Sequence, residues 1–312
     1  MIRRLSICFS AMIFTLAALA GEDSEREGGI LGTGIVGAIT QLGSIFVNGQ
    51  RIAYPSNMNV HSILGNRLAD DLVPGETVIV EASHNKGIWN ANRITHYLPA
   101  VGPATLATNS DLSVLGSHIV TPPDTTFIGF GENRQPATGD WIAVNGLWRD
   151  KEIVATQIIK IDPLPEAILM GTYDQGARKN SFFVGGTSVQ GLEIHHAKIG
   201  DALTVTGIPR KHSLDVRTVT LGLFSQPLNT VLMEGYLSKP DATGRYTIHG
   251  SGIISYVGDD KTKMSFDRGI FCTQGTKETA IQPVITDLPE EKSLRRQSLE
   301  SIGASIAQRC PM

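Results

Sequence analysis

Short runs in which apolar residues alternate with variable ones recur along the chain. Residues 75–82 begin with glycine and an acidic residue and continue as Thr-Val-Ile-Val-Glu-Ala, and similar runs return at residues 139–146 and 200–207. Because successive side chains of a strand point to opposite faces, each run predicts a strand with one face in a core. The repetition predicts several copies of one small β unit.

Each of these strands is predicted to form a hairpin with the run that follows it. A short polar turn leads to a second alternating run at residues 89–94, 153–161 and 214–221. An opening hairpin is expected before each pair, because an aromatic residue followed closely by glycine recurs at residues 46–49, 127–129, 182–185 and 246–250. The first strands of these hairpins are expected to begin near Gly34, Gly116, Gly171 and Gly235.

The fourth unit departs from the pattern. It carries the opening hairpin but lacks a clean Gly-acid strand, and residues 252–257 and 263–272 take its place. We therefore expect it to be irregular. Proline-rich connectors at 98–111, 162–166 and 226–229 mark the unit boundaries, because proline interrupts strand pairing. They are short, so the units should pack on one another. The predicted bounds of the four units are 30–103, 112–163, 168–224 and 231–286.

The end of the chain has a different period. Asp287 with Glu290 three residues later is typical of a capping box, and Pro289 suits a first helical turn. One helical face would carry the apolar stripe Leu288, Leu299, Ile302, Ile306 and Cys310. This pattern predicts one C-terminal α-helix over residues 287–312.

Composition supports a mainly all-β fold. The chain holds 33 glycines and 15 prolines but only 18% charged residues, which favours short strands and tight turns over surface helices. The predicted architecture is a tandem of small antiparallel β domains followed by one α-helix.

The first twenty residues are typical of a secretory signal peptide. Arg3 and Arg4 precede an apolar stretch over 5–16, and Ala18-Leu19-Ala20 supplies small residues for cleavage between Ala20 and Gly21. The alternative is a retained membrane anchor, but the apolar run is short and an acidic spacer over residues 21–29 follows it. We expect a periplasmic or secreted protein with no transmembrane segment in the mature chain.

Two cysteines remain after processing, Cys272 and Cys310. Disulfides persist in exported proteins, and Cys310 at the end of the apolar stripe is placed to reach the unit that holds Cys272, so we predict a bridge. The alternative is two unconnected buried thiols.

These motifs together resemble the bacterial exported domain-of-unknown-function family 5666. Residues 30–97 are the closest match, notably Gly34 to Ile39, Phe46 to Gly49, Pro74 to Val80 and Asn90 to Ile94, while residues 115–161 and 170–221 are weaker copies. The family resembles small five-stranded barrels of the OB type, so the resemblance implies tandem OB-like β-barrels. It implies no catalytic residues.

No group of residues predicts a particular chemistry, so we assign no catalytic, cofactor-binding or metal-binding residue. The GxGxxG match at residues 32–37 lacks the strand-to-helix context of a dinucleotide site. His195 and His196 are adjacent and cannot comfortably hold one metal ion, and His61, His84 and His96 have no ligand partners at a suitable spacing. The carboxylate pairs Asp70-Asp71 and Glu290-Glu291 fit a solvated loop and a helix start.

The candidate binding surface comprises two tryptophans with neighbouring arginines. Trp89 and Trp148 lie beside predicted hairpin turns, where indoles are less easily buried, and Arg93 and Arg149 could border them, with Arg134 as a further member. Core filling is the alternative for these indoles.

The expected function is that of a non-enzymatic exported protein that binds or scaffolds another envelope component, a protein or a glycan, through stacked barrels. One alternative is an envelope hydrolase with a site at a unit interface. Another is an oligonucleotide- or glycan-binding OB-like module. No nucleic-acid partner is expected, because removing Arg3 and Arg4 leaves 25 basic against 30 acidic residues. The oligomeric state stays open.

Overall fold

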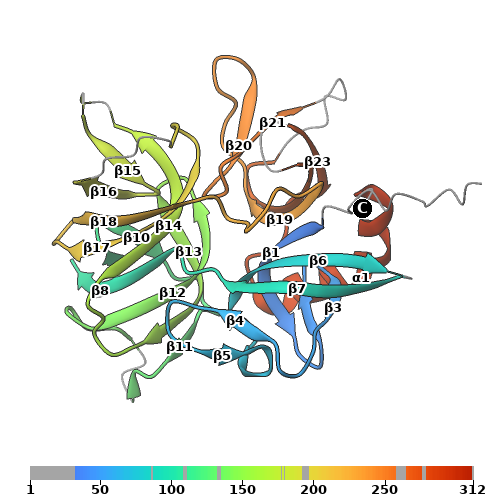
Figure 1. Ribbon diagram of the computed structural model, residues 1–312, viewed down its shortest axis with the longest axis horizontal. Helices are drawn as coiled ribbons and strands as arrows, with labels where there is room; N and C mark the ends of the chain where they lie inside the picture. Colours follow the sequence, from blue (N-terminus) through green and yellow to red (C-terminus); the bar gives the residue numbers. More distant parts are fainter. Residues whose placement is uncertain are drawn as a thin grey trace, which may run out of the picture. The chain divides into compact units, whose positions relative to one another are not determined.

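The computed structural model describes residues 32–85, 87–107, 111–131, 135–176, 178, 180–191, 197–257, 265–275 and 279–310. The predicted signal peptide, the acidic spacer, Arg134 and the pair His195-His196 lie outside these residues. Within them the protein consists of β-strands with one α-helix near the C-terminus (Figure 1). The predicted fold class, tandem β-barrels followed by one helix, is confirmed.

The first strands form a closed ring, barrel 1. Strand β1 pairs antiparallel with β2 and β6, β2 pairs with β3, β3 runs parallel to β7, and β7 returns antiparallel to β6. This order is that of an OB-type barrel. Its strands are β1 (Thr33–Gln41), β2 (Ile45–Val47), β3 (Gln50–Ala53), β6 (Thr77–Asn85) and β7 (Ile88–His96). Between β3 and β6 the chain adds β4 (Asn59–His61), β5 (Arg67–Leu68) and the short 3-10 helix η1 (Ala69–Asp71).

Barrels 2 and 3 repeat this order, because in both the third strand runs parallel to the fifth and the first pairs with the fourth. Barrel 2 consists of β8 (Ala100–Leu106), β9 (Leu112–Val114), β10 (Ser117–Val120), β12 (Trp141–Arg149) and β13 (Glu152–Lys160), with β11 (Thr126–Ile128) added along β13. Barrel 3 consists of β14 (Ala167–Gln175), β15 (Phe182–Val184), β16 (Thr187–Gln190), β17 (Ala202–Pro209) and β18 (Ser213–Leu221).

Barrel 4 is irregular, as the sequence predicted. Its first and second strands meet only through a bridge between Leu237 and Ile248. Its strands are β19 (Thr230–Tyr236), β20 (Arg245–Ile248), β21 (Ile253–Val257), β22 (Arg268–Gln274) and β23 (Thr279–Ile285). The pairing of β22 with both β19 and β23, and of β21 with β20 and β23, completes the OB-type order.

A β-bulge recurs in the Gly-acid strand of the first three barrels. The register shifts at Ala82 in β6, at Gly146 in β12 and at Gly207 in β17. A Cβ atom on Gly207 would lie 2.0 Å from the carbonyl oxygen of Asp215, and one on Gly146 would lie 2.3 Å from that of Val154. Bulges increase local twist and bend, so this position lets each strand curve around its barrel.

One predicted connector is wrong. Residues 100–106, expected within a proline-rich linker, form β8, the first strand of barrel 2, and the unit bounds 30–103 and 112–163 therefore divide a strand. Pro103 is tolerated because one edge of β8 pairs with β14 at residues 100–101 and with β9 at residues 104–106, and Pro103 lies between these two pairings.

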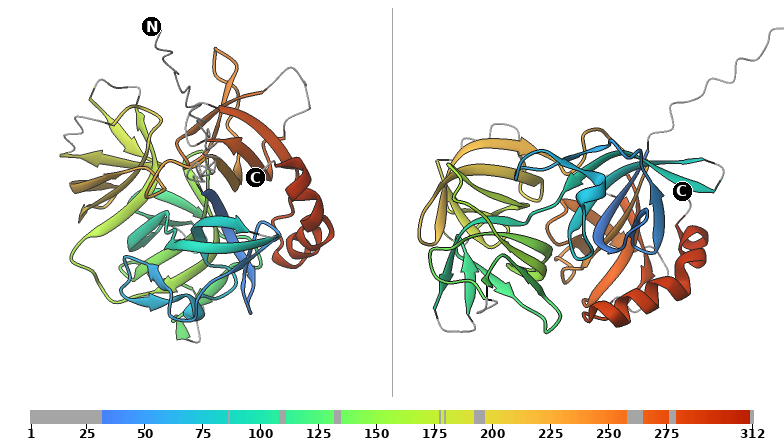
Figure 2. Two further views of the ribbon diagram at one scale, coloured as in Figure 1. Left: turned by 45° about the vertical axis from the view of Figure 1, so that its right-hand side comes forward. Right: turned by 90° about the horizontal axis from the view of Figure 1, so that it is seen from below.

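The helix begins later than predicted. Helix α1 spans Lys292–Arg309 with Glu291 as N-cap. Asp287 instead adopts a left-handed backbone conformation (φ 58°), and Glu290 contacts Arg268, so these two residues do not form a capping box. The predicted apolar stripe does pack: Leu288, Leu299, Ile306 and Cys310 are buried against β22 and β23 residues, while the side chain of Ile302 lies outside the description. Figure 2 shows α1 beside barrels 1 and 4.

The barrels contact one another in a closed cycle. Strand β8 of barrel 2 pairs with β14 of barrel 3, and Gly252 of barrel 4 lies against Ala202 of barrel 3. Strand β1 runs parallel to β19, which joins the first barrel to the last. One apolar cluster includes buried residues of all four barrels, among them Ile79, Ile142, Leu203 and Phe271, while a second cluster fills barrel 1.

The disulfide gives the first prediction. The structure joins Cys272 on β22 to Cys310 at the end of α1, as expected, across a sequence separation of 38 residues. The double variant Cys272→Ser/Cys310→Ser should unfold with a free energy lower by about 4 kcal/mol, because the bridge restricts the unfolded chain. Denaturant titration measures this difference. If an alkylating agent modified both cysteines of the unreduced folded protein, the bridge would be refuted.

Candidate functional site

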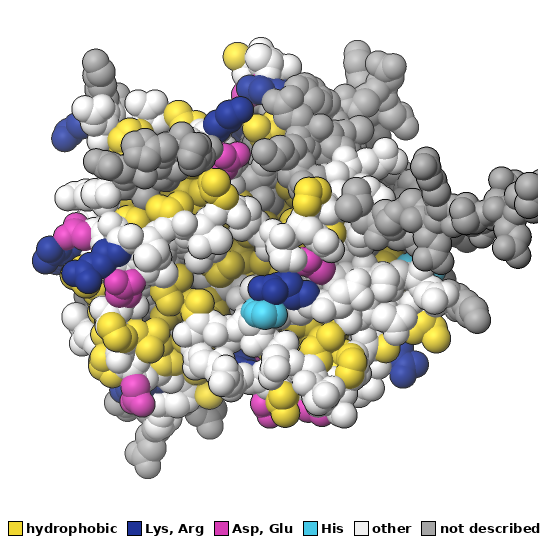
Figure 3. Space-filling model, viewed as in Figure 1, with side chains coloured by type: hydrophobic (Ala, Val, Ile, Leu, Met, Phe, Trp, Pro, Cys, Tyr) yellow, Lys and Arg dark blue, Asp and Glu magenta, His cyan; other side chains and the backbone are white. Residues whose placement is uncertain are grey.

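A groove lies between barrel 1 and barrel 3. It has a volume of about 590 Å³ and is lined by residues from β4, β7 and the segment after β4 on one side, and from β14, β17 and β18 on the other. That volume is within the range of small-molecule sites. Figure 3 shows hydrophobic side chains gathered between these two halves of the molecule, with polar side chains around them. The lining residues are Asn59, Val60, His61, Ser62, Ile63, Gly65, Asn66, Thr95, His96, Met170, Thr204 and Thr220.

Threonines form the barrel 3 wall of the groove. Thr204 on β17 lies opposite Thr220 on β18, and two residues along, Thr206 lies opposite Thr218. Since side chains two residues apart share a face, these four hydroxyls stand on one outer surface. The hydroxyl of Thr206 is 2.7 Å from that of Thr218. Thr204 and Thr220 make no side-chain hydrogen bond to any residue that the structure describes, so their hydroxyls are available to a ligand.

Amide, hydroxyl and imidazole groups form the barrel 1 wall. Ser62 accepts a hydrogen bond from the Leu64 amide at 3.1 Å, which holds the segment after β4 in a tight turn. Nδ1 of the buried His96 lies 3.4 Å from the Ser62 hydroxyl, and Nε2 lies 2.7 Å from Oδ1 of Asn145 in barrel 2. His96, which lines the groove, is therefore held in place by Asn145 of barrel 2.

The groove carries no formal charge at neutral pH. No Asp, Glu, Lys or Arg is among its lining residues. Burial lowers the pKa of His96, outweighing the opposing effects of Glu76 and Asn145. The pKa of His61 is also lowered, by burial first and by the charge of Arg93 second. Both imidazoles are therefore neutral above about pH 6.5, the ordinary histidine pKa.

The prediction that Trp89 and Trp148 lie on an exposed binding surface is wrong, because both indoles are buried. Trp89 is 4% exposed and donates its Nε1–H to Oε1 of Gln50, while Trp148 is 1% exposed and donates to the carbonyl oxygen of Met170. Both indoles found hydrogen-bond acceptors inside the fold, which allows them to be buried in spite of their nearby turns. Neither ring can stack on a ligand in this structure.

The neighbouring arginines are engaged in separate ion pairs. Arg93 lies 4.0 Å from Glu81 on β6, and Arg149 lies 2.6 Å from Glu152 on β13. Each belongs to a different barrel, so the structure does not assemble the four predicted residues into one surface. Arg93 is nevertheless close enough to the groove for its charge to lower the pKa of His61.

The sequence does not predict the groove, although two of the scattered histidines, His61 and His96, both line it. His84 instead packs against Trp89 with ring centroids 4.5 Å apart. The available signal was the sequence Thr-Val-Thr, which occurs at residues 204–206 and again at 218–220. Threonines alternating with a valine that faces the core indicate an outer face that is polar and uncharged.

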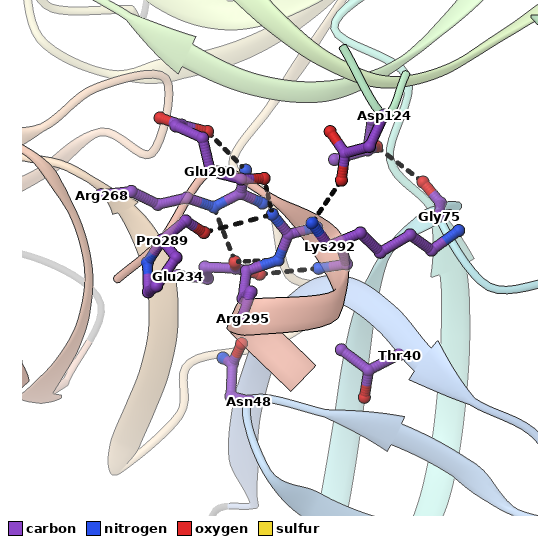
Figure 4. Close-up of polar contacts among 12 residues, drawn as sticks. Thr40, Asn48, Gly75, Asp124, Glu234, Arg268, Pro289, Glu290, Lys292 and Arg295 are labelled. Atoms are coloured by element: carbon purple, nitrogen blue, oxygen red, sulfur yellow. Dashed lines mark hydrogen bonds and ion pairs between the residues drawn. The ribbon is translucent and has the colours of Figure 1, made fainter. Parts of the chain in front are cut away.

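A buried ionic cluster joins barrels 1 and 4 to α1. The carboxylate of Glu234 on β19 lies 2.8 Å from Arg268 Nε and 3.7 Å from Arg295 Nε, and it accepts a hydrogen bond from the Ala38 amide of β1 at 2.9 Å. Figure 4 shows Glu290 at the start of the helix contacting Arg268 from the other side. Barrel 1 thus contributes the Ala38 amide, barrel 4 contributes Glu234 and Arg268, and α1 contributes Arg295.

This cluster is not suited to acid–base chemistry. Burial alone would raise the pKa of Glu234, but Arg268, Arg295 and the Ala38 amide outweigh it and lower the pKa. A carboxylate held permanently ionised by two arginines cannot exchange a proton near neutral pH. Its role is to hold the surrounding elements together.

Asn48 and Gly37 complete the junction. The Asn48 amide donates hydrogen bonds to the carbonyl oxygens of Val36 and Leu232, at 2.9 Å and 3.1 Å, and so connects β1 to β19. Gly37 belongs to the GxGxxG match, which lies in strand β1. A Cβ atom there would lie 2.3 Å from Oδ1 of Asn48 and 2.8 Å from Oε2 of Glu234, so glycine serves close packing at this position.

A second hollow of about 660 Å³ lies beside the start of α1. Its charged residues are engaged with the protein: the Lys292 amide donates to Asp124, Lys292 Nζ donates to the Pro74 carbonyl oxygen, and Arg296 pairs with Glu300. This hollow therefore belongs to the junction between α1 and the barrels. Among the residues that the structure describes, no group of His, Cys, Asp and Glu could hold a metal ion.

These observations define a protein class: a β protein of four OB-type barrels with a neutral groove between the first and the third. Residues 101–159, from β8 to β13, match the family model described as Domain of unknown function (DUF5666). The resemblance to that family is confirmed for this segment, whereas the sequence motifs had placed the closest match at residues 30–97. No curated protein and no solved structure matches the chain. No helix in the described residues is long and apolar enough to cross a bilayer.

The second prediction concerns Glu234. The variant Glu234→Gln should lower the free energy of unfolding at pH 7 by about 3 to 5 kcal/mol, because it leaves two buried arginines with one fewer counter-charge. The pKa of Glu234 is lowered in the folded protein, so its stabilisation is present above the unfolded pKa of about 4.3 and is lost as pH falls through the folded pKa. The gap between wild type and variant should therefore narrow in acid.

Glu300→Gln is the matched control. Glu300 pairs with Arg296 on the surface, where both side chains are about half exposed, so its loss should cost at most about 1 kcal/mol. Denaturant titration across pH measures both variants. Equal stability losses for the two, or a gap for Glu234→Gln that does not change with pH, would contradict this assignment.

Proposed function

We propose that the protein is exported to the bacterial envelope and there binds another envelope component, without converting it chemically, in the groove between barrels 1 and 3. The observation that carries this proposal is the groove itself, which combines ligand-sized volume, unengaged polar side chains and no charged lining residue. Its walls come from barrels that are not consecutive in the chain, so the stacking of the barrels creates the site.

Two observations support export. Residues 1–20 have the order of a secretory signal peptide, with arginines, an apolar stretch and small residues. The Cys272–Cys310 disulfide suits an oxidising compartment, because cytosolic thiols are generally kept reduced. The periplasm or the exterior is therefore the proposed location.

The third prediction tests this location. Mass spectrometry of the protein purified from the periplasmic and secreted fractions of its own cells should find a chain that begins at Gly21 and has lost the mass of residues 1–20. A chain that retains Met1 and stays in the cytosolic fraction would refute export.

The fourth prediction tests the groove. Asn66→Arg places a large cation at the groove, whereas Asn92→Arg makes the same change at an exposed position of barrel 1 outside it. Immobilised mature protein should capture a specific component from envelope extract, and Asn66→Arg should reduce the amount captured at least about tenfold, the effect of losing roughly 1.4 kcal/mol of binding.

Asn92→Arg should capture as much as wild type, and circular dichroism should confirm that both variants fold. Thr220→Arg blocks the groove from the opposite wall and should reproduce the loss. Undiminished capture by both groove variants would contradict the proposal.

A hydrolase is the second candidate function, favoured by the arrangement of Ser62, His96 and Asn145. If Nε2–H of His96 donates to Asn145, Nδ1 is the acceptor that faces the Ser62 hydroxyl, which is the order of a nucleophile, a base and an orienting group. It ranks second because the Ser62–His96 distance of 3.4 Å is long and Ser62 is already engaged by the Leu64 amide. A fluorophosphonate probe that labels wild type but not Ser62→Ala would favour the hydrolase.

A nucleic-acid ligand is not included in the proposal. Binding to phosphates relies on lysine and arginine, and neither residue lines the groove. The resemblance to OB-type barrels concerns architecture, and the two tryptophans predicted to form a stacking surface, Trp89 and Trp148, are buried.

A further inference from the structure

We propose that the ligand of the groove is a neutral saccharide, held by the facing hydroxyl and amide side chains of barrels 3 and 1. The inference rests on the proposed function, because it assumes that the groove is the binding site, and it adds the chemical class of the ligand.

Charge excludes most other small ligands. An anionic ligand would lose its hydration without gaining a cation among the lining residues, because His61 and His96 are held neutral and no Lys or Arg lines the groove. A cationic ligand would likewise meet no carboxylate there. The groove therefore favours a ligand that is polar but uncharged.

The polar groups of the groove match hydroxyl-bearing ligands. A threonine hydroxyl donates one hydrogen bond and accepts others, and an asparagine side chain offers both an acceptor and two donors. Thr204 and Thr220 provide two such hydroxyls side by side, since directly opposed residues have Cβ atoms about 5 Å apart. Asn59, Asn66 and Thr95 face them from barrel 1, and none of the three side chains bonds to another described residue.

Apolar side chains occupy the same groove. Val60 and Met170 are buried, and Ile63 is 39% exposed. A sugar ring presents hydroxyls at its edge and C–H groups on its faces, so a site for it needs hydrogen-bonding groups together with apolar contacts. The mixture of threonine, asparagine and aliphatic residues provides both.

Two strands of the groove, β17 and β4, cannot add an extended peptide as a neighbouring strand. A peptide that extends a sheet needs a strand with a free edge. Strand β17 is already paired with β14 and β18, and β4 is already paired with β5 and β7. These two strands therefore contribute to the groove through their side chains, as a saccharide site requires.

Isothermal titration calorimetry tests the inference with four probes. The neutral probes are the tetrasaccharides tetra-N-acetylchitotetraose, maltotetraose and cellotetraose, and the anionic probe is tetragalacturonate. At least one neutral probe should bind wild type, with an affinity that changes little between low and high salt because no ion pair forms. The double variant Thr204→Val/Thr220→Val should bind that probe about tenfold more weakly, because two hydrogen bonds of roughly 1 kcal/mol each are lost in part to water.

Thr247→Val is the matched control, because Thr247 is half-buried on β20 of barrel 4, outside the groove, and its variant should bind as wild type does. Binding of tetragalacturonate alone, or full affinity in the double variant, would overturn the inference. If no neutral probe binds while Asn66→Arg still abolishes envelope capture, the ligand class is wrong and the binding function stands. If no neutral probe binds and Asn66→Arg captures as much envelope component as wild type, both the saccharide inference and the proposed binding function fail.

Discussion

The pairing of β1 with β19 is the constraint on which the rest of the structure depends. These strands are separated in the sequence by the rest of barrel 1 and by barrels 2 and 3, yet Thr33 to Val36 run beside Thr230 to Met233. Two side chains pair polar groups at this contact: Glu234 accepts a hydrogen bond from the Ala38 amide, and Asn48 donates to the carbonyl oxygens of Val36 and Leu232. Arg268 and Arg295 in turn form ion pairs with Glu234. Barrel 4 is thereby fixed to barrel 1 after the chain has passed through barrels 2 and 3.

The groove follows from this closure. Contacts between consecutive barrels alone would leave barrel 1 free to separate from barrel 3, because no pair of described strands joins the two directly. Once the last barrel returns to the first, the outer face of β17 and β18 is held opposite β4. Asn145 of barrel 2 stabilises the same arrangement by contacting both His96 and the Thr77 amide. The buried charges thus support the site from a distance and do not line it.

The sequence was sufficient for the features that depend on local pattern. Two-residue alternation, turn glycines and the apolar stripe of the tail predicted the repeated β domains, the helix and the bridge between Cys272 and Cys310, and the family resemblance added that the domains are barrels. The sequence was insufficient for features that depend on contacts between distant residues. Pro103 predicts a break in a strand, yet it lies in β8 between the residues that pair with β14 and those that pair with β9, where the missing N–H is tolerated. The position of Trp148 beside a turn predicts exposure, yet its indole is buried and donates a hydrogen bond to the Met170 carbonyl oxygen. The groove was not predictable because its walls meet only through the order in which the barrels stack.

The central claim is that barrels 1 and 3 act together as one binding site. Amide hydrogen exchange of the mature protein, measured with and without the component it captures, tests this claim most directly. The account predicts slower exchange in residues 59–66 and in residues 217–221 within the same complex. Protection confined to one barrel, or to α1 and barrel 4 alone, would contradict it.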